Sequence, residues 1–209
     1  MSEIAIVDYG MGNLRSAAKA LERVGARVEV TRDHRTIAEA AGVVLPGVGA
    51  FGEAMRHVNR LGLAAPLAER VASGGPLLGI CLGLQLLFDG SDEHGGHEGL
   101  GFVGGWVRRL EAPGLKVPHI GWEPVRWTRA TPLTDGIDDG TPFYLVHSYA
   151  VQPADPADTI GEAAFGDPFC CAVQRGPVHG VQFHPEKSSS AGLALLRNFV
   201  ALCGAPAPA

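Results

Sequence analysis

The sequence predicts an α/β fold of three layers, with a mostly parallel central sheet, helices on both faces and antiparallel additions in the C-terminal half. Short apolar runs alternate with amphipathic stretches over residues 4–88, which is the pattern of repeated βα units. Glycines stand at the turns after several of these runs, where a strand-to-helix connection needs a flexible backbone. Over residues 102–183 the pattern changes to short strands and Pro/Gly turns, which favours the antiparallel additions.

The first part of the chain is expected to alternate strand and helix. Residues 4–7 form the first strand, and an amphipathic helix over residues 14–24 is stopped by Gly25. Apolar runs predict further strands and periodic stretches predict the helices between them: strands at 27–31, 42–45 and 76–80, and helices at 35–40, 50–59 and 63–72.

The connections and the end of the chain complete this pattern. Pro46-Gly47-Val48-Gly49 is interpreted as a turn just beyond the third strand. A helix is expected to follow Cys81, and residues 89–101 are interpreted as a polar, glycine-rich loop. Residues 188–202 are expected to form a closing helix.

Length and charge indicate one soluble domain. The chain has 209 residues, enough for one α/β core, so we interpret residues 1–204 as a single domain and residues 205–209 as a flexible tail. Its 17 Lys and Arg against 22 Asp and Glu give a formal charge of −5, and the absence of a long basic run disfavours nucleic-acid binding. No apolar stretch reaches about 18 residues and no signal peptide is evident, so we expect a cytoplasmic protein away from membranes.

The cysteines and paired histidines do not indicate a metal site. The four cysteines form no CxxC pair, and a chain of this length does not need disulfides: Cys81, Cys170, Cys171 and Cys203. His94 and His97 are three residues apart, but no helix is predicted to present them, so a solvated loop is the better interpretation.

Cys81 has the surroundings of a nucleophile. It stands between Gly79 and Gly83 where a buried strand is expected to become a helix, and glycines there would allow a sharp bend. This segment alone fits a small buried thiol in a tight turn equally well.

A base and an orienting group are found near the end of the chain. His184 follows a strand-like run, and the carboxyl ends of parallel strands meet at one edge of a sheet, so His184 and Cys81 are expected to meet there. Pro185 restricts His184 to an extended conformation, and Glu186 would then hydrogen-bond the imidazole. Together these residues supply a nucleophile, a base and an orienting carboxylate.

Acyl transfer also needs N–H donors for the oxyanion of the tetrahedral intermediate. At a nucleophile elbow one donor is the amide of the following residue, here Leu82. A second could come from the amide of Val48 or Gly49, since their turn also lies beyond a strand end. Taken alone, that turn is better interpreted as an ordinary connection.

The combination of these segments resembles the class I, or triad, glutamine amidotransferases. The resemblance rests on Gly79-Ile80-Cys81-Leu82-Gly83, on Gln85, and on Gln182-Phe183-His184-Pro185-Glu186 about a hundred residues later. Further segments are similar to one branch of these enzymes, the glutaminase subunits of imidazole glycerol phosphate synthase: residues 8–16, 46–51, 118–122, 143–149 and 184–188. One departure is Glu123, because that branch usually has asparagine after the tryptophan of its IGW segment.

The resemblance implies a function and a partner. The chain would hydrolyse glutamine to glutamate and ammonia, and the ammonia would pass through a (β/α)8-barrel cyclase subunit to a ribotide, in histidine biosynthesis. Cys81 would attack the side-chain amide, His184 would protonate the leaving ammonia, and Glu186 would orient the imidazole. Gln85 would help to bind glutamine, and no cofactor or metal is expected.

The same resemblance places three residues at the partner interface: Asn13, Arg15 and Lys187. For Asn13 a simpler interpretation is that its side chain caps the first helix.

Other functions remain open on the sequence alone. The chain could be the glutaminase of another synthase, although its residues 8–16 and 118–122 argue against this. A cysteine peptidase or γ-glutamyl hydrolase can carry a similar Cys-His arrangement, and assays with glutamine and γ-glutamyl peptides would separate these activities. A regulatory pseudo-glutaminase is disfavoured by the intact Cys81, His184 and Glu186.

Overall fold

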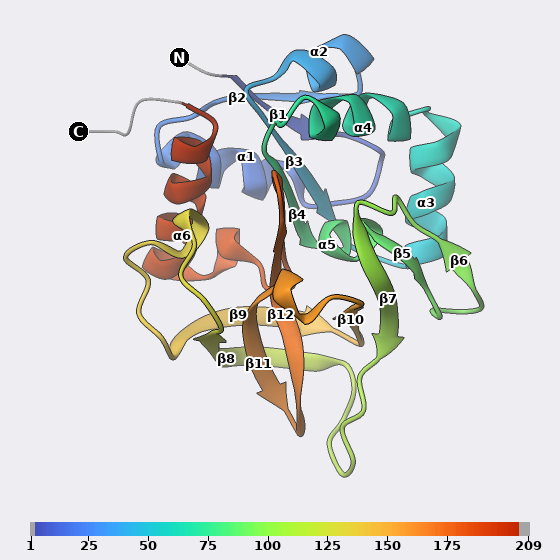
Figure 1. Ribbon diagram of the computed structural model, residues 1–209, viewed down its shortest axis with the longest axis vertical. Helices are drawn as coiled ribbons and strands as arrows, with labels where there is room; N and C mark the ends of the chain where they lie inside the picture. The colour runs from blue at the N-terminus through green and yellow to red at the C-terminus, as the bar shows by residue number, and fades with distance from the viewer. Residues whose placement is uncertain (1–2, 205–209) are drawn as a thin grey trace.

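A five-stranded parallel sheet forms the centre of the molecule. The computed structural model describes residues 3–204, so the predicted tail at 205–209 lies outside the described residues (Figure 1). The central strands run in the order β2-β1-β3-β4-β13, and each neighbouring pair is parallel. Their bounds are β1 Glu3–Val7, β2 Arg27–Thr31, β3 Gly42–Gly47, β4 Leu77–Cys81 and β13 Val178–Val181.

Helices cover both faces of this sheet, which confirms the predicted three-layer architecture (Figure 1). Along β1, Ile4 and Ile6 pack into the core beneath one set of helices, while Ala5 and Val7 pack into the core on the opposite face. The first set is α1 Leu14–Arg23 and α6 Ser189–Leu202. The opposite set is α2 His34–Glu39, α3 Phe51–Arg60, α4 Ala64–Ala72 and α5 Leu82–Leu86.

The C-terminal half extends the sheet with mainly antiparallel strands, as predicted (Figure 1). β12 pairs antiparallel with β13 and joins the additions to the parallel centre, whereas β5 and β7 form a parallel pair. The added strands are β5 Phe88–Ser91, β6 His97–Glu98, β7 Val103–Arg109, β8 His119–Trp127, β9 Thr141–His147, β10 Tyr149–Pro153, β11 Thr159–Phe165 and β12 Asp167–Arg175. Three short 3-10 turns complete the described fold: η1 Pro132–Thr134, η2 Pro156–Asp158 and η3 Pro185–Lys187.

Two sequence interpretations were wrong. Residues 89–101 are not a loop throughout, because β5 continues through Ser91 and pairs with both β6 and β7. These short strands hold polar residues and glycine, so they show no apolar alternation. Pro46 and Gly47 belong to β3 and pair with β4, whereas β1 pairs with β3 only as far as Val44. The proline therefore sits where the strand has a neighbour on one side, which proline tolerates.

The sheet register brings three strand ends together. Gly47 at the end of β3 is paired with Cys81 at the end of β4, and Ile80 is paired with Val181 at the end of β13. A ligand-binding crevice is expected beyond the carboxyl ends of such strands. None of the helices within residues 3–204 has the length and apolar character needed to cross a membrane.

Candidate active site

Cys81 occupies a strained turn between β4 and α5. Its φ of 56° and ψ of −111° are uncommon for a residue with a side chain. A Cβ on Gly79 would lie 2.7 Å from the Gly83 carbonyl oxygen, and one on Gly83 would lie 1.7 Å from the Leu45 carbonyl oxygen. Only glycine fits at both positions, so the two glycines allow the sharp bend that presents Cys81 at the edge of the sheet.

His184 and Glu186 are joined by a buried hydrogen bond. His184 is extended, with φ −99° and ψ 96°, and Pro185 then starts the 3-10 turn η3. That turn places the Glu186 Oε1 atom 2.8 Å from His184 Nδ1. The interaction leaves Nε2 as the ring nitrogen available for proton transfer.

Ser188 fixes the backbone of this segment against β9. Its Oγ donates a hydrogen bond of 2.7 Å to the His184 carbonyl and accepts one of 3.0 Å from the Tyr144 amide. The His184 amide donates to the Tyr144 carbonyl at 2.9 Å. These bonds hold the imidazole on a rigid support.

The environment of His184 favours its charged form. Burial lowers the pKa of His184, but the influence of the neighbouring Cys81 and Glu186 outweighs burial and raises the pKa to about 9. The buried Nε2 atom makes no hydrogen bond of normal geometry within the described residues. With its pKa raised in this way, His184 carries a proton at neutral pH.

Two polar groups contact the Cys81 sulfur directly. The Val146 carbonyl accepts from Sγ at 3.9 Å, and the Gln182 Nε2 atom donates to Sγ at 3.7 Å. Gln85 supports this donor, because its Nε2 contacts the Gln182 Oε1 atom at 3.0 Å and the Tyr149 carbonyl at 3.1 Å. Gln85 therefore lines the pocket and also holds Gln182, the residue that donates a hydrogen bond to the Cys81 sulfur.

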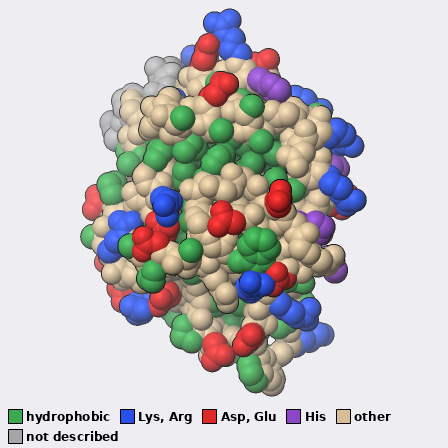
Figure 2. Space-filling model, turned by 45° about the vertical axis from the view of Figure 1, so that its right-hand side comes forward, with side chains coloured by type: hydrophobic (Ala, Val, Ile, Leu, Met, Phe, Trp, Pro, Cys, Tyr) green, Lys and Arg blue, Asp and Glu red, His purple; other side chains and the backbone are tan. Residues whose placement is uncertain are grey.

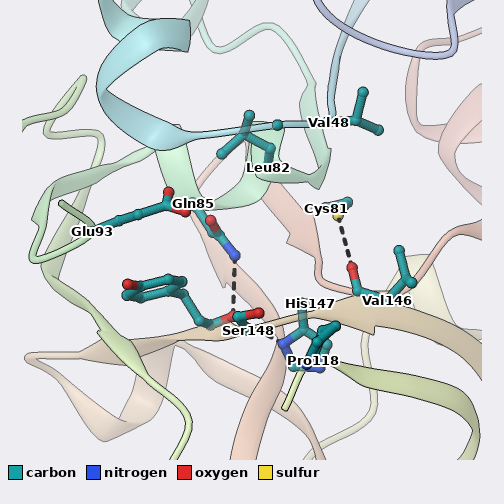
Figure 3. Close-up of a pocket in the computed structure, with 11 residues that line it drawn as sticks. Val48, Cys81, Leu82, Gln85, Glu93, Pro118, Val146, His147 and Ser148 are labelled. Atoms are coloured by element: carbon teal, nitrogen blue, oxygen red, sulfur yellow. Dashed lines mark hydrogen bonds between the residues drawn. The ribbon is translucent and has the colours of Figure 1, made fainter.

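A pocket of about 270 Å³ opens at Cys81 (Figure 3). This is below the range of about 300–1,000 Å³ that is typical for drug-sized ligands, and it suits a small substrate. Figure 3 shows Gln85 and Glu93 on one side of the pocket and Val146 close to Cys81. The lining residues include polar side chains from three separate segments, among them Glu93, Gln85, His147 and Ser148.

The structure adds residues to which the sequence assigned no role. Glu93 lies in the pocket wall, and its Oε2 accepts a 2.7 Å hydrogen bond from the Phe51 amide at the start of α3. This bond gives a loop carboxylate a fixed position. Gln182 belongs to a segment that resembles the glutamine amidotransferases, but only the folded chain shows that its side chain reaches Cys81. No periodicity could have indicated either contact.

Other predicted site residues fall into two groups. Leu82, Val48 and Gly49 line the same pocket as Cys81, and Gly49 has a φ of 103°, a value that favours glycine. Their role as oxyanion donors remains a prediction. His184 and Glu186 border a small neighbouring cavity with Asn13, and Val48 borders both spaces.

The predicted interface residues lie on the surface. Asn13 is exposed, and its Oδ1 accepts a 3.3 Å hydrogen bond from the Ser16 amide, so the side chain does cap α1. Arg15 is exposed, and the Lys187 Nζ atom lies 5.8 Å from the centre of the Tyr144 ring. Their contact with a partner remains a prediction. Within residues 3–204, no group of three or more His, Cys, Asp or Glu is placed to hold a metal ion.

The arrangement of the site defines a class of enzyme. A cysteine at a strained strand-to-helix turn, with a buried imidazole and carboxylate nearby, is suited to breaking an amide bond through a thioester. The sequence model for glutamine amidotransferase class-I matches residues 5–203. The chain belongs to this family of glutamine amidotransferases.

Curated relatives place the chain more narrowly, among the HisH subunits of imidazole glycerol phosphate synthase. It is 53% identical over 199 residues to the subunit from Moorella thermoacetica, covering 95% of this chain and 94% of the relative. It is 51% identical over 197 residues to the subunit from Rhodopirellula baltica, covering 94% of this chain and 96% of the relative.

Solved structures share the fold at much lower identity. A glutamine amidotransferase superposes with a TM-score of 0.75 at 22% identity, over 96% of this chain and 98% of that one. PurLQS from Thermotoga maritima superposes with a TM-score of 0.76 at 20% identity, over 96% of this chain and 99% of that one. These likenesses concern the fold alone.

Proposed function

We propose that this chain is the glutaminase subunit of an imidazole glycerol phosphate synthase, and that Cys81, His184 and Glu186 form its catalytic triad. The observation that carries the assignment is the buried 2.8 Å contact between His184 and Glu186, formed beside the strained turn that presents Cys81. The identity of about 50% to HisH subunits over nearly the whole chain supports the reaction and the pathway, histidine biosynthesis.

Glutamine is bound through its two ends. The Glu93 carboxylate is held in the pocket wall by the Phe51 amide and is suited to accept hydrogen bonds from the substrate ammonium. Gln85 lies between Glu93 and Cys81 in the pocket (Figure 3), where it is suited to contact the body of the substrate. The side-chain amide of glutamine then reaches the sulfur.

The first half of the reaction forms a thioester. The Cys81 thiolate attacks the amide carbon, and the carbonyl oxygen becomes an oxyanion that takes hydrogen bonds from the amides of Leu82 and of Val48 or Gly49. His184 gives its Nε2 proton to the amide nitrogen. The carbon–nitrogen bond breaks, and ammonia leaves.

The second half releases glutamate. Neutral His184 takes a proton from water, and the resulting hydroxide attacks the thioester carbon. The carbon–sulfur bond breaks and the thiolate is restored beside the imidazolium. Glu186 keeps its hydrogen bond to Nδ1 throughout and so holds Nε2 toward the sulfur.

The ammonia is used by a second subunit. We assign this partner as a (β/α)8-barrel cyclase that joins the ammonia to a ribotide, giving imidazole glycerol phosphate and aminoimidazole carboxamide ribotide. Asn13, Arg15 and Lys187 are the proposed contacts with the cyclase.

The test uses the complex of this chain with its cyclase. Cys81→Ala should abolish glutamine-dependent cyclisation and leave the reaction with added ammonium salt unchanged, because the cyclase chemistry lies in the other subunit. Cys170→Ala is the matched control, since that thiol lies on β12, away from the pocket lining. Glutamate release within a few-fold of the unsubstituted enzyme in Cys81→Ala would overturn the assignment. Cleavage of γ-glutamyl peptides in preference to glutamine would favour a hydrolase.

A further inference from the structure

Two buried histidines and a carboxylate form a continuous chain that ends in the wall of the active-site pocket. His119 at the start of β8 and His147 at the end of β9 are cross-strand partners. The His119 Nδ1 atom lies 3.2 Å from the His147 Nε2 atom, and the His119 Nε2 atom lies 3.2 Å from the Glu123 Oε1 atom. At the other end, His147 Nδ1 lies 2.9 Å from the Tyr149 carbonyl oxygen.

The number of protons that the contacts among Tyr149, His147, His119 and Glu123 need can be counted. Both ends are acceptors, because the Tyr149 carbonyl and an ionised Glu123 carboxylate carry no hydrogen. The two imidazoles between them make three contacts, and each contact needs one proton on a nitrogen. Two neutral imidazoles carry one proton each. Three contacts therefore share two protons, and this group of residues is one proton short.

No choice of tautomers removes this deficit. If His147 carries its proton on Nδ1 for the Tyr149 carbonyl, then His119 must carry its proton on Nδ1, and the His119 Nε2 lone pair faces the Glu123 carboxylate. If both protons are moved to the Nε2 atoms, the His147 Nδ1 lone pair faces the carbonyl instead. In either case two acceptors face each other at about hydrogen-bonding distance in a buried place, which is costly.

We propose that Glu123, His119 and His147 form a proton-binding site that takes up one proton and thereby fixes the His147 ring in the pocket wall. With that proton, His119 donates from both nitrogens, to Glu123 and to His147, and all three contacts become hydrogen bonds. The short contacts of the structure fit this loaded form. Without the proton, the Glu123 side chain, which is 28% exposed, turns toward water, and His119 loses its contact with the carboxylate.

The groups around the rings indicate where the proton resides. The pKa of His119 lies below its ordinary value, because burial outweighs the charge and hydrogen bond of Glu123, which act in the opposite direction. The pKa of His147 is lowered to about 4, mainly by burial and also by the charges of His119 and His184, against the opposing effect of the contact with the Tyr149 carbonyl. The aromatic neighbours Phe165 from β11 and Phe169 from β12 carry no charge. His147 stays neutral, and we place the proton at the contact between His119 and Glu123 because the carboxylate lies beside that ring alone.

The pocket is affected because His147 and Pro118, the neighbour of His119, both line it. In the loaded form the His147 ring is held from both sides, by the Tyr149 carbonyl and by His119. The same proton thus couples the solvent-facing side of β8 to the surface that meets the substrate. Glu123 is a positioning residue in this arrangement, since it acts on the pocket through two other side chains.

The proton count is tested by NMR on the folded chain labelled with ¹⁵N-histidine and ¹³C-glutamate. As the pH falls from about 9 to about 5, a range in which an imidazole ordinarily titrates and a free glutamate does not, either His119 Nε2 or the Glu123 carboxyl should become protonated. Glu123→Gln supplies an N–H donor to the His119 Nε2 lone pair, so its three contacts are complete without the extra proton. In Glu123→Gln, His119 Nε2 should stay unprotonated over the same range.

A matched control keeps this test specific. Glu162→Gln removes a carboxylate of similar exposure that pairs with Arg126 on the same sheet, and it should titrate like the unsubstituted chain. The proposal is overturned if neither His119 nor Glu123 of the unsubstituted chain takes up a proton, or if His119 titrates identically in Glu123→Gln.

A kinetic readout rests additionally on the proposed function. The KM for glutamine of the cyclase complex should change at the pH where the Glu123–His119–His147 site takes up its proton. This change should be absent in Glu123→Gln and present in Glu162→Gln. If NMR shows the proton but no variant hydrolyses glutamine, the proposed function fails and the proton site stands. If KM breaks at the same pH in Glu123→Gln, the positioning role of the site is excluded.

Discussion

The side chains of His184 and Glu186 are in hydrogen-bond contact although they are only two residues apart, and they are 3% and 4% exposed. The 3-10 turn that starts at Pro185 makes this spacing possible, because it folds the chain back within one turn. A carboxylate this close and this buried controls the charge of the imidazole.

The pKa of His184 should therefore fall when Glu186 is neutralised. In Glu186→Gln, burial still lowers the pKa while one of the groups that raise it is lost, so the midpoint should move from about 9 toward acid. NMR titration of the imidazole measures it, with the exposed carboxylate variant Glu98→Gln as control. An unchanged midpoint near 9 in Glu186→Gln would show that Cys81 alone holds the proton.

The same pair predicts how stability depends on pH. Because the pKa of His184 is raised above its ordinary value of about 6.5, the pair stabilises the folded chain fully below that value, and the effect is lost as the pH rises through about 9. The free energy of unfolding of the unsubstituted chain should thus exceed that of Glu186→Gln most strongly near pH 6. Urea titrations between pH 6 and pH 10 measure this difference, and a constant difference would contradict the assignment of the charge to His184.

Loss of the base should reduce glutamine hydrolysis more than loss of the orienting group. His184→Ala removes proton transfer and should reduce kcat by about 10²–10⁴-fold. Glu186→Ala leaves an imidazole that can still transfer protons from a less ordered position, so its loss should be smaller. Steady-state kinetics of the cyclase complex measure both, and the exposed His34→Ala is the control. Negligible losses in both triad variants would make the turn at Pro185 purely structural.

The glycine after the turn should tolerate no side chain. A Cβ on Gly83 would lie 1.7 Å from the carbonyl oxygen of Leu45, so Gly83→Ala must displace α5 or β3. We expect a loss of about 1–3 kcal/mol in the free energy of unfolding, together with loss of activity as Cys81 moves. Gly96→Ala, where a Cβ would meet nothing within 4 Å, is the matched control. Equal denaturation midpoints for the two variants would show that the backbone relaxes there freely.

Glu93 should control substrate affinity more than turnover. Glu93→Gln keeps an oxygen for the Phe51 amide. It removes the negative charge that we propose binds the substrate ammonium. A hydrogen bond to a charged group contributes about 1.5–3 kcal/mol, so KM for glutamine should rise about ten- to hundredfold. Glu98→Gln on the neighbouring β6 should leave KM unchanged. A fall in kcat at constant KM would place Glu93 in the chemistry instead.

The sequence predicted the parallel centre and the elbow well because both rest on local patterns. The apolar run before Cys81, its flanking glycines and the strand-like run before His184 each carry their own signal. The short strands β5 and β6 carry none, since their pairing partners and the burial of Phe88 arise only in the folded chain.

The parts of the site that the sequence missed depend on long-range contacts. Gln182 reaches Cys81 across 101 positions, and Glu93 reaches the start of α3 across 42. Single glutamine and glutamate residues are common on surfaces, so neither residue type nor spacing distinguishes these two.

The chemical state of the cysteines makes the chain a natural target for selective labelling. Burial raises the pKa of the Cys170 and Cys203 thiols to about 12 and also raises that of Cys171 well above its ordinary value, so these three stay neutral and react slowly with electrophiles. Cys81 faces a pocket and has an imidazolium beside it. Iodoacetamide added at neutral pH should therefore modify Cys81 selectively. A ligand bound in the pocket should protect the Cys81 sulfur, and peptide mass analysis would measure this protection.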